Sequence, residues 1–296
     1  MSRPNFSFVT AMMLLGMTVG ACADTVLDRN GVPFDESASS PVQYVNPETL
    51  KALGGRQLAF DAKISEVVRE QVEIGTKVYS AKRGAGLVMD VQTGEILAMS
   101  TYERFDAHPA NSSGAQYNLA SQGLYGFGLS AKAITIAAGL EAGVIKSDTL
   151  LDARKPLKIG KYEIEDRVPT RKRLTPEQAV VNASNIAITR VHMLLGSENT
   201  KLAFHRAGQF SQIDVEGVNS AEPMVPKDWN ETSAVSVAFG SGYEITPLQA
   251  ATVIASFANG GMLVKPTIFK VEQYPADSKR LWSKETADFM LAAMRK

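Results

Sequence analysis

The spacing of apolar and polar residues predicts a helix followed by a β-hairpin in the first half of the chain. Apolar side chains recur at roughly helical spacing over residues 57–72, among charged residues. Two short apolar runs follow, at 86–91 and 95–101, and the turn formers Thr93 and Gly94 lie between them. Two apolar runs joined by a short turn favour antiparallel strands with a shared buried face.

The second half of the chain carries a series of helix signals. Residues 132–142 are almost all apolar or small and end before Gly143, which predicts a helix buried on every side. Thr175 and Thr246 each precede a proline, a pair typical of helix N-termini. Together the pattern predicts one mixed α/β domain over residues 58–296, with helices buried beside an antiparallel sheet.

The first 22 residues have the pattern of an export signal that ends in a lipid-attachment site. An apolar run from Phe6 to Val19 leads to Val19-Gly20-Ala21-Cys22, which resembles a bacterial lipobox, where the cysteine is diacylated and becomes the mature N-terminus. Two alternatives stay open: a soluble secreted protein, or an uncleaved anchor, although the run is short for a span of about 20 residues. Each alternative places the rest of the chain outside the cytoplasm, in the cell envelope or beyond it.

Residues 23–57 lack helical and strand periodicity, so we expect a linker before the domain. Within it, Asp28-Arg29-Asn30-Gly31 predicts a turn, because an Asn-Gly pair tolerates positive φ angles. The expected organisation is a signal segment over 1–22, a linker over 23–57 and the domain over 58–296.

Composition excludes several classes of protein. The 31 Lys and Arg residues balance 31 Asp and Glu residues, so the chain has no net positive charge that would indicate a nucleic-acid partner. One cysteine and three histidines argue against an intramolecular disulfide and against a Cys- or His-based metal site. We therefore expect neither a metal ion nor a nucleic-acid partner.

Several short motifs follow one another along the chain in a fixed order. They are Gly94–Met99, Asn118–Ala120, Tyr125–Gly128, Ala183–Ala187, Phe239–Gly242, Ile245–Gln249 and Ala258–Gly261. This ordered set resembles the transpeptidase domain of class B penicillin-binding proteins, with matching order and spacing over roughly 240 residues. Asp28–Gly31 and Val45–Thr49 resemble a shortened form of the family's membrane-proximal pedestal.

The resemblance implies a fold like those of penicillin-binding proteins and serine β-lactamases, and a reaction without a cofactor. In that reaction a serine attacks the D-Ala-D-Ala carbonyl of a peptidoglycan stem peptide, and an amine of a second stem resolves the acyl-enzyme. Penicillin acylates the same serine. The family carries three catalytic motifs, Ser-x-x-Lys, Ser-x-Asn and Lys-Thr-Gly.

The first of these motifs has lost its nucleophile in this sequence. The family's Gly-Ser-x-x-Lys falls on Gly128-Leu129-Ser130-Ala131-Lys132, so Leu129 occupies the position of the serine. Ser130 is a weak substitute, because two residues along a helix turn it about 200° away from Lys132. Without its serine, we expect Lys132 to be a buried lysine paired with Asn185 or with a carbonyl oxygen.

The other two motifs are incomplete or absent. The family's Ser-x-Asn falls on Ala183-Ser184-Asn185, which lacks the first serine but keeps an amide, Asn185, that could bind a peptide group. No Lys-Ser/Thr-Gly occurs in the chain. Residues 284–295 resemble the helix that precedes this motif in the family. The resemblance thus implies a domain that is incomplete at its C-terminus and lacks strands that its apolar face should pack against.

Three functions follow from these motifs. The first is an inactive penicillin-binding-protein homologue in the cell envelope, which binds a peptidoglycan stem peptide or a β-lactam without acylation, or binds cell-wall synthesis or division proteins. The second is a decayed gene fragment without function. The third is an active D,D-transpeptidase or β-lactam-reactive enzyme that uses Ser130 or Ser184. Loss of the nucleophile typically removes about six decades of rate in acyl-transfer enzymes, which favours an inactive chain.

Overall fold

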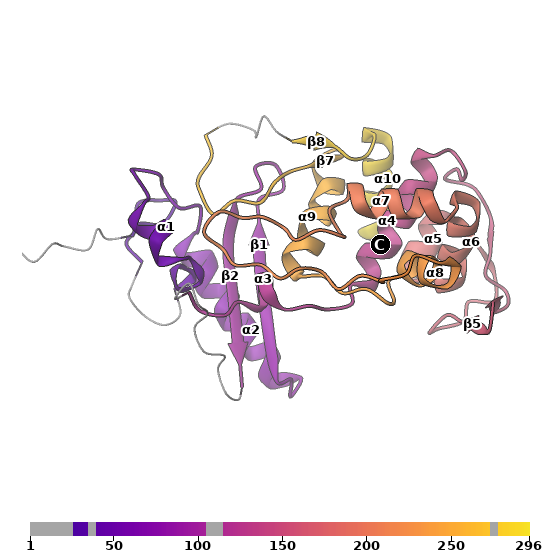
Figure 1. The fold of residues 1–296 in the computed structure, drawn as a ribbon, viewed down its shortest axis with the longest axis horizontal. Helices are drawn as coiled ribbons and strands as arrows, with labels where there is room; N and C mark the ends of the chain where they lie inside the picture. Colours follow the sequence, from indigo (N-terminus) through magenta and orange to yellow (C-terminus); the bar gives the residue numbers. More distant parts are fainter. Residues whose placement is uncertain (1–25, 35–39, 105–114, 273–277) are drawn as a thin grey trace, which may run out of the picture.

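The computed structural model describes residues 26–34, 40–104, 115–272 and 278–296. These form two lobes with α9 (Pro247–Ala258) between them (Figure 1). The hairpin lobe is built around the helix and two strands of residues 62–103, and the helical lobe around the helices of residues 128–239 and 284–294. The helices are η1 (a 3-10 helix, Pro41–Tyr44), α1 (Pro47–Lys51), α2 (Ala62–Val78), α3 (Leu119–Gln122), α4 (Gly128–Glu141), α5 (Pro176–Val181), α6 (Asn185–Leu195), α7 (Ser197–Arg206), α8 (Glu231–Phe239), α9 (Pro247–Ala258) and α10 (Lys284–Met294).

The strands form antiparallel pairs, of which only the first is long. They are β1 (Arg83–Met89) with β2 (Ile96–Glu103), β3 (Leu151–Asp152) with β6 (Arg173–Leu174), β4 (Leu157–Ile159) with β5 (Tyr162–Ile164), and β7 (Met262–Leu263) with β8 (Lys279–Arg280). The expected mixture of helices and antiparallel strands is confirmed.

The β1–β2 hairpin is the sheet that the apolar pattern predicts, and helix α2 covers one of its faces (Figure 1). Two glycines of β1 allow this close packing. A Cβ atom on Gly86 would lie 2.6 Å from Val72 and 2.7 Å from Val68, and one on Gly84 would lie within 2.4 Å of the Thr76 hydroxyl. Contacts this short do not occur between real side chains, so the helix can approach the strand only because these positions are glycines.

The segment before the domain is fastened to the hairpin lobe. The predicted turn at Asp28 forms, with Gly31 at φ 79°. The buried Asp28 carboxylate accepts hydrogen bonds from the backbone N–H groups of Val32 and Ala62, and these bonds lower its pKa. Arg29 forms an ion pair of 3.1 Å with the buried Glu95 of the hairpin. The turn thus joins the N-terminal segment, α2 and the hairpin.

The expected linker contains more regular structure than its sequence indicates. Helices η1 and α1 lie within it, and Tyr44 and Val45 are buried in the same core as Leu58, Phe60 and Ile96. Short helices of four or five residues have too few turns to produce a periodic pattern, which explains why the sequence did not predict them. The domain boundary after residue 57 stays a prediction.

Helix α4 is the centre of the helical lobe, and α5 to α8 and α10 pack around it. It begins at Gly128, four residues before the expected start, and its residues from Ser130 to Gly139 are all buried. The predicted caps are present at α5 and α9, where Thr175 and Thr246 each form a reciprocal capping box with a glutamine three residues later. Helix α7 begins at Ser197, directly after Gly196.

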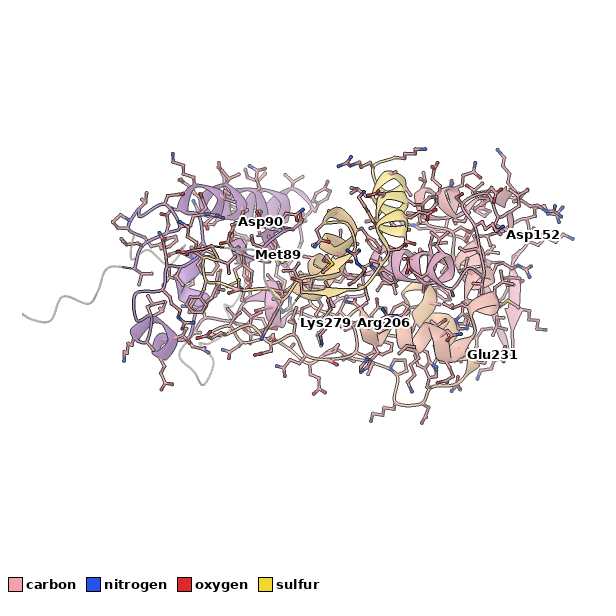
Figure 2. The ribbon with its side chains drawn as sticks, turned by 90° about the horizontal axis from the view of Figure 1, so that it is seen from above. Met89, Asp90, Asp152, Arg206, Glu231 and Lys279 are labelled. Carbon is pink, nitrogen blue, oxygen red and sulfur yellow. The ribbon has the colours of Figure 1, made fainter. Side chains whose placement is uncertain are left out.

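Helix α9 contributes side chains to both lobes. Leu248 belongs to the core of the hairpin lobe, whereas Val253 and Phe257 belong to the core of the helical lobe. Trp282 stacks on Phe257 with 5.6 Å between ring centroids, and its indole N–H donates to Ser256. The two lobes therefore share one packed element. Figure 2 shows their extent, with Met89 and Asp90 in the hairpin lobe and Asp152 and Glu231 in the helical lobe.

The expected export signal and Cys22 lie outside the described residues. Over the part of the chain that the structure describes, none of the helices has the length and hydropathy that a membrane span requires.

A buried histidine connects α6 and α7 in the helical lobe. The Nδ1 atom of His192 lies 2.8 Å from the Thr200 hydroxyl, which itself donates to the Gly196 carbonyl oxygen at 2.9 Å. Because that hydroxyl proton is used, His192 donates through Nδ1. Burial lowers the pKa of His192, and the charge of Glu231 opposes this only in part. The folded state therefore holds this histidine in its neutral form.

We expect the stability of the domain to fall as the pH drops below about 6.5, the ordinary pKa of an unfolded histidine. Below that pH, His192 binds a proton more readily in the unfolded chain than in the folded chain. The free energy of unfolding therefore decreases by at most about 1.4 kcal/mol per pH unit. Urea unfolding between pH 7.5 and 5.5 measures this slope. The variant His192→Gln should flatten it, while His205→Gln, on the exposed side of α7, should not. A slope that persists unchanged in His192→Gln would contradict the assignment.

Candidate functional site

The motif lysine is buried and its ammonium group binds a backbone carbonyl. Lys132 is 8% exposed, and its Nζ donates to the Phe239 carbonyl oxygen at 2.8 Å. This bears out the expected pairing with a carbonyl oxygen and not the one with Asn185. Burial lowers the pKa of Lys132, and the negative charge of Asp166 opposes that shift.

The carbonyl that receives Lys132 belongs to the last turn of α8, whose four terminal carbonyls would otherwise lack partners. Gly240 and Ser241 turn back and donate to the carbonyls of Val237 and Ser236, as in a Schellman motif. The remaining two carbonyls accept from α4: Thr135 donates to Ala238 at 2.7 Å and Lys132 donates to Phe239. A cation at a helix C-terminus is also favoured by the helix dipole.

Two glycines bring α4 and the end of α8 into contact. A Cβ atom on Gly240 would lie 2.3 Å from the Cα atom of Gly128, and Gly240 also has a φ of 89°, in the left-handed region. Gly128 is the first residue of α4. The glycines of the Gly128 and Phe239–Gly242 motifs therefore place the Phe239 carbonyl within reach of Lys132.

The residues before Lys132 do not form a serine–lysine pair. Leu129 lies in the first turn of α4 with 52% of its surface exposed. Ser130 is 4% exposed, and its hydroxyl donates to the Phe127 carbonyl oxygen at 2.8 Å. Ser130 and Lys132 thus bind different carbonyls, which agrees with their expected separation around the helix.

The second motif begins α6, and an acidic residue holds it there. Ser184 is the N-cap: its hydroxyl accepts from the Ala187 N–H and donates to the Asp166 carboxylate at 2.8 Å. The other oxygen of Asp166 accepts from the Ile186 N–H at 2.9 Å. Asn185 donates through Nδ2 to the Glu165 carbonyl oxygen at 2.9 Å, so its amide nitrogen is engaged within the protein.

The sequence did not single out Asp166 or the Phe239 carbonyl. Asp166 is 6% exposed and accepts a hydrogen bond from Ser184, 18 residues away in the sequence, at the first turn of α6. Its negative charge also opposes the lowering of the Lys132 pKa. Nothing in its local sequence indicates that role. The carbonyl of Phe239 is a backbone group, which residue types do not reveal. Lys132 lies on α4, and Ser184 and Asn185 lie at the start of α6.

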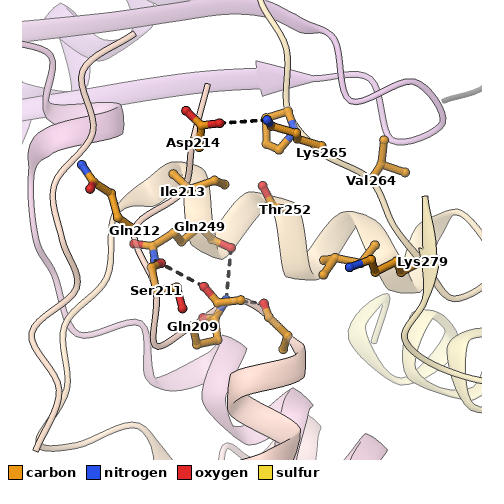
Figure 3. Close-up of a pocket in the computed structure, with 14 residues that line it drawn as sticks. Gln209, Ser211, Gln212, Ile213, Asp214, Gln249, Thr252, Val264, Lys265 and Lys279 are labelled. Carbon is orange, nitrogen blue, oxygen red and sulfur yellow. Dashed lines mark hydrogen bonds and ion pairs between the residues drawn. The ribbon is translucent and has the colours of Figure 1, made fainter. Parts of the chain in front are cut away.

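A separate pocket of about 300 Å³ lies between α9 and the loop that follows α7 (Figure 3). Gln249 projects from α9 and donates to the Ser211 carbonyl oxygen at 2.8 Å, and an exposed ion pair joins Asp214 to Lys265 at the rim. The residues of the three catalytic motifs, Leu129, Ser130, Lys132, Ser184 and Asn185, do not line this pocket. It is therefore distinct from the site on α4 and α6.

Comparison with known proteins identifies the family. The model of the penicillin binding protein transpeptidase domain matches residues 84–296. The chain is 31% identical over 252 residues to the "Probable peptidoglycan D,D-transpeptidase FtsI" of Caulobacter vibrioides, covering 83% of this chain and 43% of that relative. It is 25% identical over 261 residues to the peptidoglycan D,D-transpeptidase FtsI of Escherichia coli, covering 86% of this chain and 42% of that relative. The chain thus spans less than half the length of either relative.

A solved structure agrees on the fold. The transpeptidase domain of penicillin-binding protein 3 from Burkholderia pseudomallei superimposes with a TM-score of 0.71 at 24% identity, covering 81% of this chain and 69% of that one. The family match, the FtsI relatives and the shared fold lead to one conclusion: the chain belongs to the class B penicillin-binding proteins, and residues 84–296 are its transpeptidase domain.

Proposed function

We propose that this chain acts in the peptidoglycan-synthesis context of the cell envelope as a binding domain that forms no acyl-enzyme. The observation that carries the proposal is the half-exposed Leu129 at the nucleophile position on α4. A leucine side chain has neither an oxygen to attack a carbonyl nor a proton to transfer. The ligand would be a peptidoglycan stem peptide or a β-lactam held without a covalent bond, or a protein of cell-wall synthesis or division.

The hydrogen bonds around Leu129 support the same proposal. An attacking serine needs a neighbouring base that removes its proton. The two candidate serines donate elsewhere, Ser130 to the Phe127 carbonyl and Ser184 to Asp166. Lys132, the base that the family motif provides, is committed to the Phe239 carbonyl. Each side chain of the motif remnants thus stabilises α4, α6 or α8.

We expect no covalent adduct when the full chain is incubated with a fluorescent penicillin and its intact mass is measured. No serine in the site is paired with a base, so the rate should fall by about six decades relative to an active enzyme. Ser130→Ala and Ser184→Ala are the matched controls and should give the same mass as the unmodified chain. An adduct that forms on the chain and disappears in Ser130→Ala would establish the active alternative instead.

We expect a single cooperative thermal transition, which separates a maintained binding domain from a decayed fragment. The reason is that α9 places Leu248 in one core and Phe257 in the other, so that neither lobe can lose its packing alone. Differential scanning calorimetry with near-ultraviolet circular dichroism measures the transition. A broad transition, with dye binding and no fixed aromatic signal before heating, would favour the decayed fragment.

We further propose that Cys22 is the lipid-attachment site and holds the chain at the membrane. Two acyl chains bind stably to a bilayer, since each buried methylene contributes about 0.8 kcal/mol. Cys22→Ala should therefore move the protein from the membrane to the soluble envelope fraction, as judged by immunoblotting, whereas Thr18→Ala should leave it in place. If Cys22→Ala remains in the membrane, the segment is an uncleaved anchor and the lipid proposal is wrong.

A further inference from the structure

Residues 152–173, which include strands β4 and β5, carry a concentrated positive charge. The chain as a whole is balanced, yet this segment holds eight of its 31 lysines and arginines against four of its 31 acidic residues. All eight basic side chains are exposed. We call residues 152–173 the basic region. An excess of one charge sign on one part of a neutral protein attracts partners of the opposite sign.

The fold directs these charges outward, because the apolar side chains of the basic region are buried. Leu157, Ile159 and Ile164 of β4 and β5 belong to the core of the helical lobe, whereas Lys158 and Glu163 on the same strands are exposed. Successive side chains of a strand point to opposite faces, so the hairpin buries one face and presents the other to solvent.

The acidic residues of the basic region neutralise little of its charge. Asp166 is buried and holds the start of α6. Asp152 binds Arg154 through both carboxylate oxygens, at 2.9 and 2.7 Å, and faces Arg173 in the β3–β6 pair. Among the residues that the structure describes, Arg154 is the only basic side chain of the region that forms an ion pair. The other seven are available to an anionic partner.

An exposed aromatic ring lies among these cations. Tyr162 on β5 is 51% exposed, and the Nζ atom of Lys161 lies 5.3 Å from the centre of its ring. A tyrosine offers an apolar face and a polar tip, which suits a partner that is both apolar and wet. Sugar rings have such apolar C–H faces, whereas a phosphate group has none. Cations around an exposed tyrosine therefore favour an anionic carbohydrate.

The basic region lies far from the N-terminal segment. Strand β5 is at the opposite end of the molecule from α1 (Figure 1), and Asp152 lies at the same end (Figure 2). Val26, the first described residue, packs on the core of the hairpin lobe. If the segment before Val26 is attached to a membrane, as proposed above, the basic region is at the end of the molecule that points away from that membrane. This position favours a partner in the wall over the lipid surface.

We propose that the basic region binds an anionic glycan strand, with Tyr162 packed on a sugar ring and Lys158, Lys161 and Lys172 paired with carboxylates that the strand carries. A single exposed ion pair is weak. Several pairs along one strand act together, because the first contact holds the next carboxylates close to the remaining cations. The proposal takes the envelope location from the proposed function, but it uses none of the motif residues on α4 and α6.

Co-sedimentation of the full chain with protein-free peptidoglycan sacculi tests this contact. We expect saturable binding at low salt and release at about 1 M NaCl, where the screening length falls to about 3 Å. Amidation of the sacculus carboxylates should abolish binding. Lys161→Glu combined with Lys172→Glu should raise the dissociation constant about tenfold. The matched control, Lys63→Glu combined with Lys82→Glu, makes the same charge change at exposed positions of the hairpin lobe and should leave the constant unchanged.

Tyr162→Ala tests the sugar contact separately from the charges. Loss of the ring should weaken binding to sacculi about threefold. Binding to polyglutamate, which has carboxylates and no sugar, should stay unchanged. Tyr79→Ala removes an exposed ring from the hairpin lobe and should affect neither probe. A Tyr162→Ala variant that binds sacculi normally, or that loses polyglutamate to the same extent, overturns the packing of Tyr162 on a sugar.

The remaining outcomes decide between the basic region and other surfaces. Absence of binding to sacculi at low salt overturns the proposal. Binding that survives in the Lys161 and Lys172 variant also overturns it and leaves the α4–α6 site as the contact, so the proposed function would stand. A preference for phosphatidylglycerol over phosphatidylcholine vesicles that this variant abolishes would assign the region to a membrane instead. The penicillin experiment does not depend on any of these results.

Discussion

The helical lobe depends on how the last turn of α8 finds hydrogen-bond partners inside the protein. Its four terminal carbonyls are all satisfied, two by the returning backbone and two by Lys132 and Thr135 of α4. Leaving a buried carbonyl without a donor costs about 1–3 kcal/mol, and leaving an ammonium unpaired costs more. The contact of Gly128 with Gly240 makes the arrangement geometrically possible. Helix α4 therefore connects the centre of the lobe to its outer helices through polar groups as well as apolar packing.

The side chains that the resemblance singles out have structural roles in the helical lobe. Ser184 caps α6, Asp166 holds that cap, and Lys132 completes α8. Each contributes to the stability of the fold whatever the chemistry of the site. Leu129, in contrast, lies half-exposed in the first turn of α4.

Sequence patterns predicted several of the long elements, but they missed α8 and the short helices. The β-hairpin, the buried α4 and the capped starts of α5 and α9 all carry strong local signals, and the structure confirms them. Helix α1 is too short for periodicity to reveal it. The partners of the site residues depend on tertiary contacts: Asp166 reaches Ser184 across 18 residues and Lys132 reaches Phe239 across 107. No local pattern specifies such pairs.

The glycines of β1 also determine how the hairpin can be aligned. A shift of β1 by one residue would turn Ala85 and Leu87 toward α2, where even a Cβ atom at Gly84 or Gly86 has no room. Misaligned pairing is thus excluded by steric clash with the helix and not only by exposure of apolar residues. In the folded protein, helix α2 therefore accepts only the alignment that presents Gly84 and Gly86 to it.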